Sequence, residues 1–136
     1  MVKEFTISTR EEAYNLTASV RLIGRDVLVA IWGGEKPHIG AVAMAQPRPS
    51  LKNPEITSAT ASVFSYVGHK EDELAKAASE ILSATLKTRV VVTAGIHWDN
   101  IKTKGIQCII KNSEILVDLI LDRIAYEFPA LINEKY

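Results

Sequence analysis

The first half of the chain alternates apolar and polar residues with the period of two that is typical of β-strands. Residues 16–22 alternate strictly, which predicts a half-exposed strand, whereas residues 27–32 are apolar on both faces, which predicts a central strand. Three prolines within residues 46–54 predict an exposed connection without regular pairing. Further strands are predicted over residues 3–9, 38–46 and 60–67.

The strand predicted over residues 38–46 has unusually small side chains. Glycine and alanine dominate its sequence from Ile39 to Ala45. Small side chains allow a bulky group to lie close against that face of a strand. A closely crossing helix is the favoured explanation, and a bound ligand is the alternative.

The second half changes to the spacings of three and four that are typical of amphipathic helices. One helix is predicted over residues 70–86, and a buried strand follows over residues 89–95. A longer helix is predicted to begin near Thr103, with Ile106 and Ile110 in its main apolar stripe. Because this helix has more apolar surface than one sheet face needs, we expect a homodimer or higher oligomer to form through it.

The order of these elements predicts a single α+β domain over residues 1–136. The expected architecture is a mainly antiparallel sheet of five to six strands with two helices packed on one face. No predicted strand leads through a glycine-rich phosphate signature into a helix, so a Rossmann domain is not expected.

Composition narrows the classes of function. The chain has 16 basic and 16 acidic residues, and this zero net charge argues against nucleic-acid and membrane partners. Its apolar runs are far shorter than the about 20 residues of a transmembrane helix, and the N-terminus lacks the apolar core of a signal peptide. The single cysteine, Cys108, lies in an apolar helical stretch and is expected to be an inert core thiol. A cytoplasmic protein is therefore expected.

Each of the three histidines stands within two residues of a glycine and at the end of a predicted element. His38 begins a strand, His69 begins the first helix, and His97 closes the last strand. Loop ends often converge at one rim of a sheet, and such rims carry functional sites. The three histidines are therefore the first candidates for a site.

Three interpretations of these histidines stay open. Together with Asp99 they could hold a metal ion such as zinc, although the chain has no short-range pair of metal ligands, so metal is not favoured. His69 and Lys70 at a helix start could instead bind an anion, with Lys36 closing over it. The third interpretation is that they are ordinary solvated or capping residues, which is the better explanation for any single one.

Residues 97–100, His-Trp-Asp-Asn, concentrate chemical groups at one strand-to-helix junction. The indole of Trp98 can stack on a planar ligand, and Asp99 can orient an imidazole or accept a proton. Equally, Trp98 can belong to the core while Asp99 or Asn100 caps the last helix. The chain has no Gly-x-Ser-x-Gly elbow, and the acidic residues 71–73 are more simply helix-start charges, so catalysis is not favoured.

Three motif blocks together resemble one known family. They are Gly33-Gly34-x-x-Pro37-His38-Ile39-Gly40-Ala41-Val42, Gly68-His69-Lys70-x-Asp72, and Thr93-Ala94-Gly95-Ile96-His97-Trp98-Asp99-Asn100. These blocks are similar to the LpdD-type proteins, which are small accessory proteins of UbiD-type decarboxylases acting on gallate and related hydroxyarylic acids. The similarity spans nearly the whole chain, over about residues 20–121.

The resemblance implies a fold similar to that of proteasome-assembly chaperones. It also implies a non-enzymatic chaperone for prenylated flavin mononucleotide (prenylated FMN), with a UbiD-type decarboxylase and a flavin prenyltransferase as partners. The alternative is a small metal-dependent enzyme that uses His38, His69 and His97. The cofactor contacts that the resemblance implies are Gly34, His38, Gly68, His69, Lys70, His97, Trp98 and Asp99.

Overall fold

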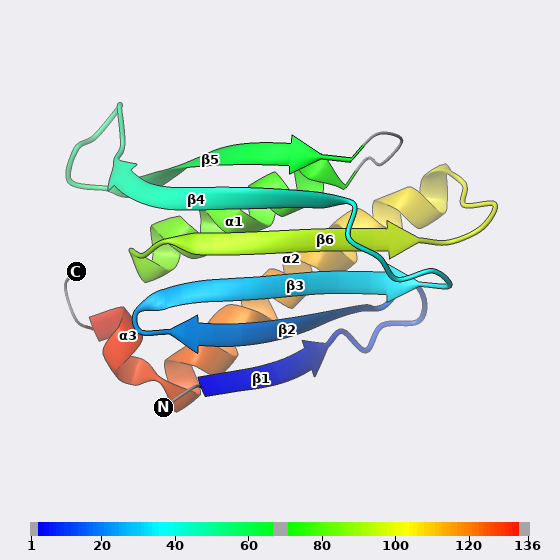
Figure 1. The fold of residues 1–136 in the computed structure, drawn as a ribbon, viewed down its shortest axis with the longest axis horizontal. Helices are drawn as coiled ribbons and strands as arrows, with labels where there is room; N and C mark the ends of the chain where they lie inside the picture. The colour runs from blue at the N-terminus through cyan, green and yellow to red at the C-terminus, as the bar shows by residue number, and fades with distance from the viewer. Residues whose placement is uncertain (1–2, 67–70, 134–136) are drawn as a thin grey trace.

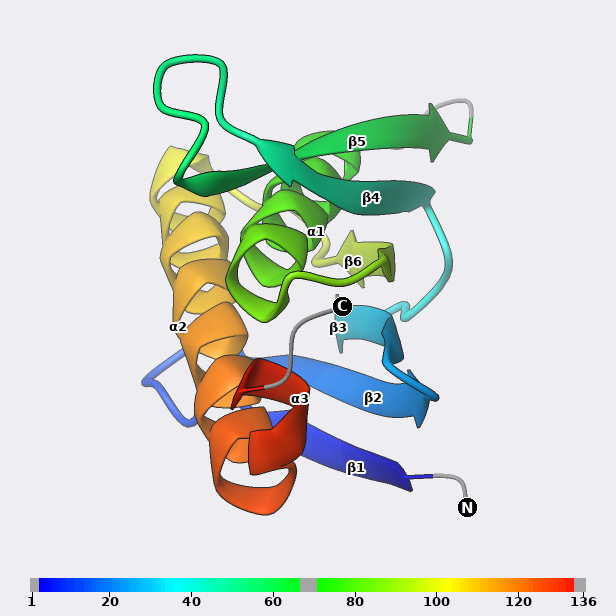
Figure 2. The same ribbon diagram turned by 90° about the vertical axis from the view of Figure 1, so that its left-hand side faces the viewer.

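In a computed structural model, which describes residues 3–66 and 71–133, the chain forms two layers (Figures 1 and 2). One layer is a six-stranded sheet, and the other consists of helices on one face of it. The predicted α+β class with a mainly antiparallel sheet is confirmed, while the short last helix was not predicted. The elements are β1 (Lys3–Ser8), β2 (Leu16–Ile23), β3 (Asp26–Gly34), β4 (Ala41–Pro49), β5 (Thr57–Ser65), α1 (Asp72–Leu86), β6 (Val90–His97), α2 (Thr103–Glu127) and α3 (Pro129–Asn133).

Strand β6 lies at the centre of the sheet, whose order is β1-β2-β3-β6-β4-β5. It runs parallel to β3 and antiparallel to β4, and the other described pairs are antiparallel. The parallel register runs from Val27 opposite Val90 to Gly34 opposite His97. Because β3 and β6 end together, the segments that follow them leave the sheet at the same edge (Figure 1).

Small side chains bring α1 close to the sheet. Ala41, Ala43 and Ala45 of β4 are buried, and α1, which packs on β4, contributes the buried Ala75 and Ala78. The closely crossing helix therefore explains the small residues of this strand. Both long helices lie on the same side of the sheet, and the opposite face carries no helix of the described chain (Figure 2).

The prediction of an exposed connection over residues 46–54 is wrong for residues 46–49. Strand β4 continues through this segment to Pro49, and Pro47 and Pro49 both lie opposite residues of β5. The pairing of β4 with β6 ends at Ala45, so β4 has β5 alone as a neighbour beyond that residue. A strand with one free side tolerates proline, because the missing N–H can face that side.

The predicted apolar stripe of the long helix is wrong at the N-terminal end of α2. Ile106 and Ile110 are 48% and 53% exposed, and Cys108 is also exposed rather than a core thiol. The buried positions there are Gly105 and Asn112, neither of which is a large apolar residue, so hydrophobic periodicity could not find them. Although α2 has 25 residues, no helix of the described segments is long and apolar enough to cross a membrane.

Asn112 fixes the loop between β1 and β2. Its side-chain amide donates to the carbonyl oxygens of Ala13 and Tyr14, both at 2.8 Å. Tyr14 has a φ of 59°, in the left-handed region, and its ring lies so close to Gly105 that a Cβ there would be 2.9 Å from the ring. One buried amide therefore joins α2 to a strained loop at the edge of the sheet.

Replacing Asn112 with alanine should lower the free energy of unfolding by about 1–3 kcal/mol, because two carbonyl groups lose their buried donor. Urea denaturation followed by circular dichroism measures the change. The control is Gln107→Ala at an exposed position of the same helix, which should change stability by less than about 0.5 kcal/mol. Equal losses in the two variants would contradict this role of Asn112.

Candidate functional site

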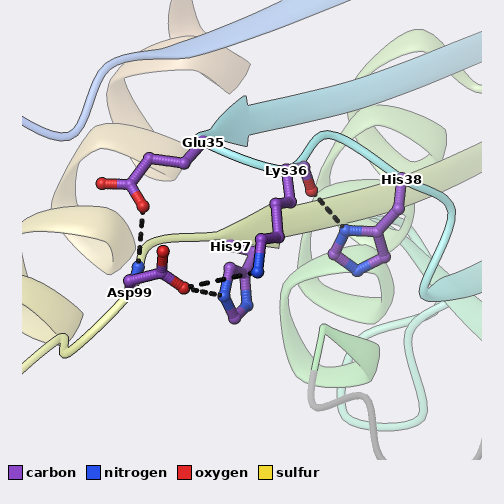
Figure 3. Close-up of polar contacts among 5 residues, drawn as sticks. All are labelled: Glu35, Lys36, His38, His97 and Asp99. Atoms are coloured by element: carbon purple, nitrogen blue, oxygen red, sulfur yellow. Dashed lines mark hydrogen bonds and ion pairs between the residues drawn. The ribbon is translucent and has the colours of Figure 1, made fainter.

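Two short segments meet at the edge of the sheet where β3 and β6 end. We call them together the rim, which consists of residues 34–38 and 97–99. The Glu35 N–H donates to the His97 carbonyl oxygen at 2.8 Å, and the Gly40 N–H donates to the Ala94 carbonyl oxygen at 2.9 Å. These backbone hydrogen bonds hold the segment after β3 against β6. Figure 3 shows the side chains that this places side by side.

Two glycines make this contact possible. Gly34 has a φ of 92°, and a Cβ at this position would overlap the carbonyl group of His97. A Cβ on Gly95 would in turn overlap the carbonyl group of His38. At each strand end, the carbonyl group of a histidine therefore packs directly against a glycine. Any side chain at that glycine would overlap the carbonyl group. This explains why His38 and His97 belong to glycine-rich motifs.

His38 lies between two acceptors. Its Nδ1 is 2.8 Å from the Lys36 carbonyl oxygen, and its Nε2 is 2.9 Å from Oε1 of Glu71. The contact with Glu71 is an ion pair when the imidazole is protonated. The side chains of His38 and Glu71 are 24% and 10% exposed, so this ion pair lies mostly out of solvent.

Glu71 is a site residue that the sequence analysis missed. We expected it to be a helix-start charge, but its Oε1 also accepts the Ile96 N–H at 3.2 Å. A Cβ on Gly40 would overlap the Glu71 carboxylate, so this third glycine makes room for it. Glu71 thus joins the start of α1 to both strand ends, and the glycine two residues after His38 is the local signal of that crowding.

His97 belongs to a second, exposed cluster (Figure 3). Its Nε2 donates to Oδ1 of Asp99 at 2.9 Å, and the ammonium of Lys36 is 3.7 Å from the same oxygen. The Asp99 N–H donates to Oε2 of Glu35 at 3.3 Å, which ties the two segments together again. The hydrogen bond from His97 lowers the pKa of the Asp99 carboxyl below its ordinary value of 3.8, and the contact with Glu35 and the positive charge of Lys36 lower it further.

Trp98 belongs to the rim and packs against the hydrophobic core. Its indole is half-buried against the core and meets the Tyr14 ring edge-on, with centroids 5.1 Å apart and planes at 77°. The packing alternative for Trp98 is therefore the one that the structure favours. The capping alternative for Asp99 and Asn100 is wrong, because the N-cap of α2 is Lys102 and makes no side-chain cap hydrogen bond.

The rim brings together five of the eight predicted contacts, namely Gly34, His38, His97, Trp98 and Asp99. His38 does not begin a strand as predicted, because β4 starts at Ala41 and His38 belongs to the segment before it. Gly68, His69 and Lys70 lie outside the described residues. Because His38 faces Glu71 while His97 faces Asp99, the two rings have separate carboxylate partners.

The side chains of the rim supply hydrogen-bond donors and acceptors. The described residues hold no group of three or more metal-ligating side chains, and the rim includes no serine, threonine or cysteine. It offers the exposed ammonium of Lys36 and the half-exposed imidazole of His97 as donors, with Asp99 and Glu35 as acceptors. This arrangement suits a ligand that carries both an anionic group and hydroxyls.

A separate hollow of about 550 Å³ lies at the other end of the sheet. It is lined by residues of β1, of the turn between β2 and β3, and of the segment around α3, including Lys3, Arg25 and Phe128. None of its lining residues belongs to the rim. It is therefore a competing location for a ligand of this chain.

Comparison with known proteins shows which family the chain matches. The family model described as "Prenylated flavin chaperone LpdD-like domain" matches residues 10–125. Protein LpdD of Lactiplantibacillus plantarum is 28% identical over 105 residues, which cover 71% of this chain and 67% of that protein. Both rim segments lie within the matched range.

A solved structure has a similar fold. The crystal structure of a chaperone complex for yeast 20S proteasome assembly superposes with a TM-score of 0.56, covering 93% of this chain and 97% of that chain at 14% identity. At this identity the likeness concerns the fold alone. The expected similarity to proteasome-assembly chaperones is confirmed.

The contacts of Asp99 predict a pH-dependent contribution to stability. Because the pKa of Asp99 is lowered in the folded chain, the ionised carboxylate stabilises the fold above the ordinary carboxyl pKa, and this contribution is lost as the pH falls through the lowered value. In His97→Ala, the Asp99 titration midpoint measured by carbon NMR should rise toward 3.8. Lys52→Ala, in the distant β4–β5 connection, should leave it unchanged, and an unchanged midpoint in His97→Ala would refute the assignment.

Proposed function

Because this chain belongs to the LpdD-like prenylated flavin chaperone family, we propose that it binds prenylated FMN and delivers it to a UbiD-type decarboxylase. The family match over residues 10–125 carries the proposal, and the family gives the chain an accessory role as a chaperone. In the proposed sequence of events, a flavin prenyltransferase supplies the cofactor. The chain itself performs no chemical step.

The phosphate of the cofactor suits the donors of the rim. Lys36 is 69% exposed, and its ammonium lies 3.7 Å from Asp99. Exposed ion pairs contribute little free energy, so Lys36 can exchange Asp99 for a phosphate with little loss of stability. His97, 44% exposed, adds a second donor where the phosphate replaces Asp99 at its Nε2. Because the net charge of the chain is zero, long-range attraction contributes little, and anion recognition rests on these local donors.

The remaining parts of the cofactor find complementary groups nearby. The carboxylates of Asp99 and Glu35 can accept hydrogen bonds from the ribityl hydroxyls. Trp32, half-buried on β3 and opposite Gly95 of β6, provides apolar surface next to the rim for the tricyclic ring. His38 acts through position, because its contacts to Lys36 and Glu71 keep the segment after β3 in place.

Isothermal titration calorimetry with prenylated FMN tests this proposal. The wild-type protein should bind, and Lys36→Ala combined with His97→Ala should weaken binding at least about 10-fold, because the two phosphate donors are lost. Lys3→Ala removes a cation at the distant hollow and should leave the affinity unchanged. The proposal fails if the wild-type protein does not bind, or if Lys3→Ala weakens binding while the double variant does not.

A further inference from the structure

A hollow of about 500 Å³ lies between β1 and α2. We call it the β1 groove, and its lining residues are Thr6, Ile7, Ser8, Arg10, Leu119 and Arg123. It shares no lining residue with the rim or with the hollow around Phe128. Strand β1 is an edge of the sheet, with β2 as its one neighbour among the described strands (Figure 1). The groove therefore combines the edge of a strand with one wall of a helix.

The backbone of β1 presents hydrogen-bonding groups at this edge. The Thr9 N–H donates to the Leu16 carbonyl oxygen at 3.0 Å, so these two residues form a hydrogen-bonded pair where β1 ends. Such pairs alternate with non-hydrogen-bonded pairs along an antiparallel ladder. Ser8 and Thr6, one and three residues before Thr9, belong to the second kind. Their N–H and C=O groups thus point away from β2, as another strand would need in order to pair with β1.

The wall formed by α2 places a cation and an apolar side chain beside this edge. Arg123 lies one turn after Leu119, and its guanidinium carbon is 4.9 Å from the centroid of the Phe5 ring. Its Nε is 2.9 Å from Oε1 of Glu127. These two contacts position the guanidinium from two sides. Because an arginine has five N–H donors, it can bind a further carboxylate in this position.

Arg10 adds a second positive charge just after β1 ends. It is exposed and forms no ion pair with the residues that the structure describes. None of the described residues that line the groove is acidic, since Glu11 and Glu12 follow Arg10 without lining it. Two arginines without a carboxylate among the lining residues favour an acidic ligand.

We propose that the β1 groove docks an extended acidic segment of a partner protein, which pairs with β1 as a seventh strand. The backbone of the segment hydrogen-bonds to Thr6 and Ser8, and every second side chain faces α2. On that face, an acidic side chain meets Arg123 or Arg10, and an apolar one meets Leu119. Pairing of the backbones supplies affinity, and the two arginines select acidic segments.

The groove lies at the end of the sheet that carries the rim. Ser8, Thr17, Trp32 and Gly95 form one row across β1, β2, β3 and β6. Because neighbouring strands are about 4.8 Å apart, the edge of β1 is about 15 Å from the end of β6. A partner protein docked on β1 therefore has the rim beside it. This docking does not depend on which ligand the rim binds.

An NMR titration of the labelled protein with an acetylated and amidated peptide, Thr-Glu-Thr-Val-Thr-Glu-Thr-Val, tests the proposal. As a strand, the peptide has its glutamates and valines on one face and its threonines on the other. It should shift the amide signals of Thr6 and Ser8. The same peptide with lysine in place of glutamate should bind at least about 10-fold more weakly, because its charges repel the two arginines.

Variants of the chain test the two parts of the contact separately. Arg10→Ala combined with Arg123→Ala should weaken binding of the acidic peptide at least about 10-fold, because its carboxylates lose their donors. Thr6→Pro removes an outward N–H of β1 and should weaken binding as well. The matched control, Ala61→Pro, makes the same change on the other edge strand, β5, where the inward N–H of Tyr66 places that of Ala61 outward. It should leave binding unchanged.

Both proline variants should keep the circular dichroism spectrum of the wild type, because an edge strand tolerates proline where its N–H faces outward. The proposal is overturned if the acidic peptide leaves the signals of Thr6 and Ser8 unchanged, or if the lysine peptide binds equally well. Glutarate, which has carboxylates but no peptide backbone, should bind far more weakly than the peptide. Equal binding of glutarate would make the groove a site for small carboxylates and would overturn strand pairing.

Discussion

The parallel pairing of β3 with β6, closed at its end by two glycine contacts, is the constraint on which the rim depends. Gly34 and Gly95 each receive the carbonyl group of a histidine, and no other residue type leaves room for it. Because the backbones are this close, the side chains of His38 and His97 emerge from one edge of the sheet. The site is thus built by backbone proximity before any side chain contributes to it.

Two carboxylates then fix the two histidines in different ways. Glu71 holds His38 mostly out of solvent and also accepts a backbone N–H of β6, so it acts as part of the scaffold. Asp99 holds His97 in an exposed cluster with Lys36, where the contacts are loose enough to be exchanged for those of a ligand. In the proposed function, this division gives a chain without net charge local donors for an anionic group.

Local patterns predicted the elements well, because strand alternation and helix spacing are recorded in consecutive residues. They also pointed to His38 and His97 as site candidates, although His38 lies before β4 and does not begin it. What they could not supply were contacts between distant segments, such as the carboxylate of Glu71 on His38 or the amide of Asn112 on the loop before β2. Periodicity likewise misplaced Ile106 and Ile110, because the positions of α2 that are buried there hold a glycine and an asparagine. Several residues of the rim were therefore predictable, whereas the carboxylate partner of His38 was not.

The most direct test of the central claim is an NMR titration of the labelled wild-type protein with prenylated FMN. If the rim holds the cofactor, backbone amide shifts should concentrate at residues 34–38 and 97–99, with smaller changes at the neighbouring ends of β3 and β6. Shifts that concentrate instead around Lys3 and Phe128, which line the hollow at the other end of the sheet, would contradict the account.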